Sequence, residues 1–124
     1  MRIVFQGDSI TDAGRDRRNY HHMGSGYPKY AAALIREAFP DADIEIIEKH
    51  HSAKLDSPSG TALMLAQAIK SVRESLTLML GRNGRRVREK NEVGIHAVRA
   101  GSIVGEHEVI IATEHEIITV SHAA

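Results

Sequence analysis

The sequence predicts a single α/β or α+β domain in which a mixed β-sheet of about five strands packs against two main helices. Two segments carry apolar residues at the three- and four-residue spacing of a helix, and several short segments are rich in Ile and Val. Three of the strand-like segments follow one another at the end of the chain, which indicates antiparallel members in the sheet. With 124 residues and 42% hydrophobic content, the chain can build one core.

Each element is predicted from its local pattern. The first strand is a short apolar run, a polar loop follows it, and a helix then begins near Pro28, since proline suits a first helical turn. Val93, Ile95 and Ala97 alternate with polar or small residues, as a half-buried strand requires. In chain order we predict a strand, a polar loop, a helix, a strand, a helix, a basic loop and three strands, at residues 2–5, 7–26, 27–39, 44–48, 59–73, 81–91, 92–99, 106–112 and 116–121.

Composition excludes several function classes. The formal net charge is zero, so we expect no general attraction to nucleic acid or to an anionic membrane. The chain has no cysteine, no apolar run of membrane-spanning length and no signal peptide before the first strand, so we expect a cytoplasmic protein. The eight histidines show no convincing ligand spacing, and we expect no metal site.

Residues 48–62 are the most informative stretch, and read Glu-Lys-His-His-Ser-Ala-Lys-Leu-Asp-Ser-Pro-Ser-Gly-Thr-Ala. They place two histidines and a lysine beside a helix start, with Ser57 suited to the N-cap and Pro58 to the first turn. Gly60 and Thr61 then put free backbone N–H groups at the positive end of the helix dipole. Such an arrangement can hold a carboxylate while His or Lys supplies a proton.

This stretch resembles the substrate-binding C-terminal domain of dihydrodipicolinate reductase, with the pattern H-H-x-x-K-x-D-[AS]-P-S-G-T-A. The resemblance extends from about Ile44 to Ala124. It implies that His50 assists the reduction of a cyclic imine and that Lys54 donates the proton. Substrate carboxylates would be held by the residues His51, Gly60 and Thr61.

Reduction also needs a hydride, which the reductases take from a nicotinamide cofactor held on an N-terminal Rossmann domain. Neither G-x-G-x-x-G nor G-x-x-G-x-x-G follows a strand in this sequence. We therefore expect no bound cofactor and regard His50 and Lys54 as vestigial catalytic groups. Weak binding of small dicarboxylates at His50, His51, Lys54, Gly60 and Thr61 is one alternative function.

The start of the chain suggests a different family. Gly-Asp-Ser-Ile-Thr at residues 7–11 follows an apolar run and resembles the first block of the SGNH, or GDSL, hydrolases, with similarity continuing to about Asp43. The resemblance makes Ser9 the nucleophile. The Gly-x-Asn-Asp and Asp-x-x-His blocks that would activate it do not occur in the sequence. Residual ester hydrolysis through Ser9 is a second alternative.

The leading hypothesis is therefore an engineered or recombined chimera within one domain of residues 1–124, with a hydrolase-like segment at 1–43 and a reductase-like segment at 44–124. We expect it to fold and self-associate, with no complete active site and no native catalytic activity. The reductase domains assemble as tetramers through strands that resemble residues 92–121, which implies a homo-oligomer, either a tetramer or a dimer.

Overall fold

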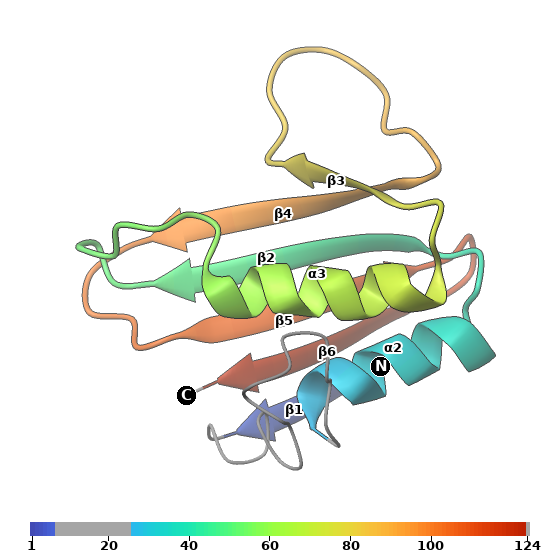
Figure 1. Ribbon diagram of the computed structural model, residues 1–124, viewed down its shortest axis with the longest axis horizontal. Helices are drawn as coiled ribbons and strands as arrows, with labels where there is room; N and C mark the ends of the chain where they lie inside the picture. The colour runs from blue at the N-terminus through green and yellow to red at the C-terminus, as the bar shows by residue number, and fades with distance from the viewer. Residues whose placement is uncertain (7–25, 124) are drawn as a thin grey trace.

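The computed structural model describes residues 1–6 and 26–123. These residues form one six-stranded mixed sheet and two helices, so the predicted α/β class is confirmed. Figure 1 shows the helices side by side in front of the sheet. The elements are β1 (Arg2–Gln6), α2 (Tyr27–Glu37), β2 (Asp43–His50), α3 (Gly60–Val72), β3 (Thr77–Leu80), β4 (Glu92–Arg99), β5 (Glu106–Ala112) and β6 (Ile117–Ala123).

The strands lie in the order β1-β6-β5-β2-β4-β3. β2 and β4 are parallel, as are β4 and β3, and β6 and β1, whereas β5 runs antiparallel to both of its neighbours. The sequence analysis missed β3, which has only four residues and lies at the sheet edge beside β4. So short a run carries too little periodicity to be separated from a loop.

Both helices pack on one face of the sheet. α2 contributes Tyr27 and Ile35 to the core and α3 contributes Leu65 and Ile69, all fully buried. On the sheet, the residues that face the helices form two apolar rows across three strands: Ile44, Ile111 and Ile118, then Ile46, Val109 and Val120. Alternation of side chains along the strands places the intervening residues on the opposite face.

The N-cap of α3 lies two residues later than the sequence analysis placed it, although the helix itself begins within one residue of the predicted range 59–73. Ser59, not Ser57, is the N-cap, and its hydroxyl oxygen accepts the Ala62 N–H at 3.1 Å. Pro58 precedes the helix, within the connection that follows β2. A capping side chain must accept the backbone N–H of the second or third helical residue, and here Ser59 does so.

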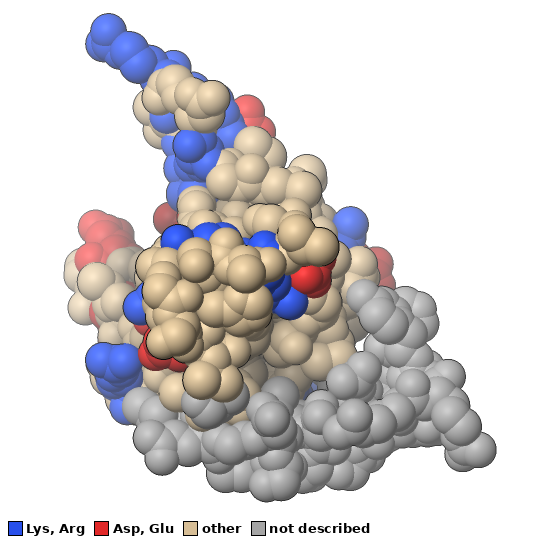
Figure 2. Space-filling model, turned by 90° about the vertical axis from the view of Figure 1, so that its left-hand side faces the viewer, with Lys and Arg blue, Asp and Glu red and all other residues tan. Residues whose placement is uncertain are grey.

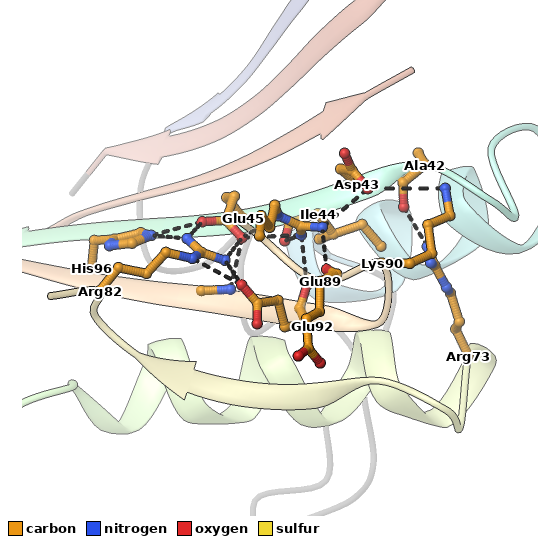
Figure 3. Close-up of polar contacts among 12 residues, drawn as sticks. Ala42, Asp43, Ile44, Glu45, Arg73, Arg82, Glu89, Lys90, Glu92 and His96 are labelled. Carbon is orange, nitrogen blue, oxygen red and sulfur yellow. Dashed lines mark hydrogen bonds and ion pairs between the residues drawn. The ribbon is translucent and has the colours of Figure 1, made fainter. Parts of the chain in front are cut away.

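The basic loop between β3 and β4 projects from the body of the protein and appears as a finger of Lys and Arg at the top of Figure 2. The sequence analysis assigned these residues only to a basic loop, and the structure shows that part of the loop is bound to the sheet. Arg82 and Arg88 fold back and form ion pairs with Glu45 on the sheet face opposite the helices, and Arg82 also pairs with Glu92 at 3.0 Å. Figure 3 shows this cluster beside β2 and β4.

Two predictions fall on residues that the structure does not describe: Ser9, and most of the polar loop at 7–26. Among the described residues, no helix is long and apolar enough to cross a membrane.

Candidate functional site

The apolar rows on the helix-covered face end in a polar row at one end of the sheet. Glu48 of β2 lies opposite His107 of β5, which in turn lies opposite His122 of β6. All three side chains are buried. Figure 1 shows that β2 ends and α3 begins at this same end, so the polar row lies beneath the predicted His-His-x-x-Lys connection.

Glu48 joins His50 to Arg99. One carboxylate oxygen contacts His50 Nδ1 through a short hydrogen bond, and the other accepts Arg99 Nη2 at 2.8 Å. Arg99 Nη2 also donates to the Asp56 carbonyl at 2.8 Å, which holds the connection against β4. Burial alone would raise the pKa of Glu48, but the hydrogen bonds from Arg99 and His50 outweigh it and leave that pKa below its usual value. Glu48 is therefore an ionised acceptor.

His107 ties the start of α3 to the sheet. Its Nε2 lies 3.0 Å from Ser59 Oγ, the atom that caps the helix. Burial, followed by the nearby His50, lowers the pKa of His107 to about 4, so the ring is neutral at pH 7. Its buried Nδ1 has no hydrogen-bond partner among the described residues. The His50 and His107 rings meet edge to face with centroids 5.3 Å apart.

The other predicted site residues lie above this buried group. His51 is exposed and outside the hydrogen-bond network, whereas Lys54 is half-buried and pairs with Asp56 at 2.9 Å. Gly60 is exposed and Thr61 is half-buried, in the first turn of α3. This end of the molecule faces the viewer in Figure 2, where Lys and Arg atoms and some Asp and Glu atoms lie among uncharged surface.

Hollows in the surface of the described residues border only part of this site. One of about 300 Å³ borders the connection at Ser57 and Pro58 and is closed on the other side by β3 and β4. A larger hollow of about 510 Å³ lies at the opposite end of β2, against residues 38–43 and 112–114, and contains none of the predicted site residues. A third hollow, of about 190 Å³, is lined by His107 and His122. Neither His50 nor Lys54 lines any of these three hollows.

Sequence reasoning missed Glu48, Arg99, Ser59 and His107 as members of the site. One signal was present for Glu48: it ends the predicted strand 44–48 two residues before His50, and the two share a face because β2 runs on to His50. Arg99 and His107 come from β4 and β5, and only the strand register brings them to Glu48.

Glu48, His50 and His107 place potential metal-ligand atoms within 4.8 Å of one another, a set that sequence spacing did not reveal. The contacts are those of a hydrogen-bond network, since Glu48 is bound to Arg99 and His107 to Ser59. Lys54 and Arg99 also make the surroundings cationic, which favours an anion over a metal ion. We assign no ion to these residues.

The comparisons with known proteins bear on this arrangement directly. The family model described as "Dihydrodipicolinate reductase, C-terminus" matches residues 27–124. The chain belongs to this family. The match includes α2 as well as the His-His-x-x-Lys connection, α3 and every strand from β2 to β6.

Individual relatives support membership of the same family. The chain is 60% identical over 97 residues to a 4-hydroxy-tetrahydrodipicolinate reductase of Clostridium novyi, with 77% of this chain and 37% of the relative covered. The corresponding enzyme of Clostridium tetani is 57% identical over 92 residues, covering 73% of this chain and 36% of that enzyme. The chain thus spans little more than a third of the length of these reductases.

A solved structure is also similar: dipicolinate-bound dihydrodipicolinate reductase from Paenisporosarcina sp. TG-14. Its TM-score is 0.63 at 33% sequence identity, and the similarity covers 79% of this chain and 38% of that one. Its sequence identity and shared fold support the same family.

These matches correct the chimera hypothesis. Residues 27–43, which we gave to a hydrolase-like segment, lie inside the reductase family match, and the matches give no support to a hydrolase-like part. The prediction of an engineered chimera is wrong: the chain belongs to a reductase family and matches its C-terminal domain. The Gly-Asp-Ser-Ile-Thr motif at residues 7–11 misled us, because it was taken to assign a helix that lies outside it.

Proposed function

We propose that this domain is the substrate-binding part of a 4-hydroxy-tetrahydrodipicolinate reductase and that it binds a planar dicarboxylate. The observation that carries the proposal is the capped start of α3, which has Gly60 and Thr61 in its first turn and follows the connection that carries Lys54. The Paenisporosarcina relative, whose title names bound dipicolinate, indicates the ligand class.

The first turn of α3 supplies the anion-binding groups. The first N–H groups of a helix have no partner within the helix, and the helix dipole favours negative charge there. Gly60 has no neighbouring atom within 4 Å of the position that a Cβ would occupy, so a ligand can approach its backbone closely. One carboxylate would bind at Gly60 and Thr61, and His51 and Lys54 would provide further positive or hydrogen-bonding contacts.

The chemistry of the site is proton transfer. Reduction of a C=N bond needs a proton as well as a hydride, and His50 and Lys54 are the groups here that can supply it. The family resemblance implies that His50 assists the reduction and that Lys54 donates the proton. The described residues do not fit a nicotinamide dinucleotide, because the connection from β2 to α3 carries no glycine before Gly60 and presents His and Lys instead. We assign no hydride step to this domain.

Calorimetric titration with dipicolinate tests the proposal. Because the site is open to water, we expect a dissociation constant between high micromolar and millimolar, or roughly 4 to 6 kcal/mol. Lys54→Ala should weaken binding at least several-fold. Lys70→Ala, which removes an exposed charge from the last turn of α3, is the matched control and should bind normally. Equal affinity for both variants would overturn the proposal.

A second copy of the chain is the partner we propose. Both helices cover the same face of the sheet, which leaves the other face to pack against a partner (Figure 1). At the ends of the strands on which we expect this contact, Val104 and Ile117 are 73% and 63% exposed. Light scattering coupled to gel filtration should give the mass of a tetramer or dimer, and a monomer at high micromolar concentration would contradict it.

A cytoplasmic location remains a prediction.

A further inference from the structure

β2 carries two glutamates that are each bound to arginine and to one histidine, on opposite faces of the sheet; Glu45 has two arginine partners, Arg82 and Arg88, and Glu48 has one. Glu45 accepts Arg82 Nη2 at 2.9 Å and contacts His96 Nε2 at 2.8 Å, on the face away from the helices. Glu48 does the same with Arg99 and His50 on the helix-covered face, at the candidate site. Only the second group includes a residue proposed to act on a substrate.

The geometry points to Glu48, held by Arg99, as a positioning residue that keeps the proton of neutral His50 on Nδ1 and leaves Nε2 as the nitrogen that exchanges a proton with a bound molecule. This inference rests on the proposed function and deepens it, because it states which atom of His50 does the chemistry.

The donors and acceptors of Glu48 and His50 support this assignment of the proton to Nδ1. An ionised carboxylate only accepts, so the His50 nitrogen that faces Glu48 must carry the hydrogen. In neutral His50 this leaves Nε2 with a lone pair, and an added proton can enter only there. Nε2 has no hydrogen-bond partner among the described residues.

Gly105 keeps that nitrogen accessible. A Cβ on Gly105 would lie 3.3 Å from His50 Nε2 and 3.5 Å from Cδ2, which is tight contact. With no side chain at this position, the only atoms of residue 105 near Nε2 are backbone atoms. Gly105, which follows β4 and its loop, is therefore a glycine at the point where a side chain would crowd His50 Nε2.

Arg99 gives the carboxylate its fixed orientation. Its Nη2 bonds both Glu48 and the Asp56 carbonyl, so the guanidinium is anchored to the β2–α3 connection as well as to the sheet. The charged and titratable groups around His50 are then Glu48 of β2, Arg99 of β4, His107 of β5, and Lys54 and Asp56 of the connection. Glu48 is the only acceptor among these that is bonded to the ring.

The Glu48→Gln variant makes a sharp prediction. Arginine offers only donors, so the amide oxygen of the glutamine must turn to Arg99 and its NH₂ group must face His50 Nδ1. Nδ1 then has to accept, and neutral His50 changes to the form with its hydrogen on Nε2. A residue that merely filled space at position 48 would leave the His50 tautomer unchanged.

The experiment is a ring ¹H–¹⁵N correlation spectrum of His50, recorded on the full chain without ligand at a pH where the ring is neutral. We expect hydrogen on Nδ1 in the unaltered protein, hydrogen on Nε2 in Glu48→Gln, and no change in Glu45→Gln, which alters the corresponding carboxylate on the other face. An unaltered protein with hydrogen on Nε2, or no difference in Glu48→Gln, would overturn the inference. The first of these results needs no variant to fold.

A second readout links the tautomer to binding. Calorimetry of dipicolinate in two buffers of different ionisation enthalpy gives the protons taken up on binding. We expect uptake to fall by more than half in Glu48→Gln, because His50 already presents a hydrogen at Nε2, and to stay unchanged in Glu45→Gln. Equal uptake in all three proteins would contradict the inference. Absence of any dipicolinate binding would overturn the proposed function instead, and the ligand-free spectra would still decide the role of Glu48.

Discussion

Ser59 Oγ and His107 Nε2 lie 3.0 Å apart in the interior, so the residue that caps α3 is also bonded to the sheet. This one contact fixes where the helix begins relative to β5, and with it the position of the Gly60 and Thr61 N–H groups. The candidate anion site is therefore held in place by a buried pair that does not itself face the ligand.

Ser59→Ala should destabilise the domain by about 2 to 4 kcal/mol, because it removes the N-cap and leaves a buried histidine nitrogen without its partner. Urea denaturation measures the change. Ser57→Ala, two residues earlier in the exposed connection, should cost less than about 0.5 kcal/mol. Equal costs for the two substitutions would show that Ser59 does not cap the helix.

Gly94→Ala should disrupt the ion cluster on the opposite face of the sheet. A Cβ at this position would lie 2.4 Å from Glu45 Oε1 and 2.6 Å from both Arg82 Nη1 and His96 Nε2. These side-chain ends can move, but only by giving up their mutual contacts, at a cost of about 1 to 2 kcal/mol. Thermal denaturation checks this against Gly60→Ala, whose added methyl meets no atom within 4 Å and should not lower the stability.

The buried state of His107 predicts a loss of stability on mild acidification. Its pKa is about 4 in the folded protein against 6.5 for a free histidine. Between these values the unfolded chain binds the proton and the folded chain does not, so stability falls as the pH drops from about 6.5 to 4, by about 3 kcal/mol. Denaturation at a series of pH values should show this slope, and His107→Gln should remove most of it. His115→Gln is the control, because the side chain of His115 is 88% exposed.

Glu45 predicts a separate loss at lower pH. Burial would raise its pKa, but hydrogen bonds from Arg82, His96, the Gly94 N–H and Arg88 lower it to about 2. Stability from this carboxylate is present above the free value of 4.5 and disappears as the pH falls through 2. After solvent screening we expect about 1 to 2 kcal/mol. In Glu45→Gln this low-pH loss should be absent while the slope assigned to His107 persists; loss of both would mean that the two groups are not independent.

The sequence was sufficient for the fold class and for most elements, because apolar spacing in the two helices and alternation in strands such as 92–99 are local signals. It also located the connection that leads into α3. It failed for β3, which is short, and for the N-cap of α3, because either Ser57 or Ser59 has a side chain able to cap and only the observed geometry distinguishes them.

The rest of the candidate site depends on register. Glu48, Arg99 and His107 come from three strands, and no spacing along the chain shows that β5 pairs with β2 and that His107 lies opposite Glu48. The same limit applies to Arg82 and Arg88, which the sequence assigns only to a basic loop and which the structure places beside Glu45. The chimera error had a different cause. The resemblance of residues 7–11 to a hydrolase motif was extended to the helix at 27–39, which lies outside the motif and inside the reductase family match.

The most direct test of the account is a backbone amide NMR titration of the full chain with dipicolinate. The account predicts saturable shifts concentrated at His50, His51, Lys54, Gly60 and Thr61, with smaller shifts at Arg99 and none around Glu45 and His96. A dispersed spectrum in which these amides do not move, or in which the shifts gather at the 38–43 hollow, would contradict it.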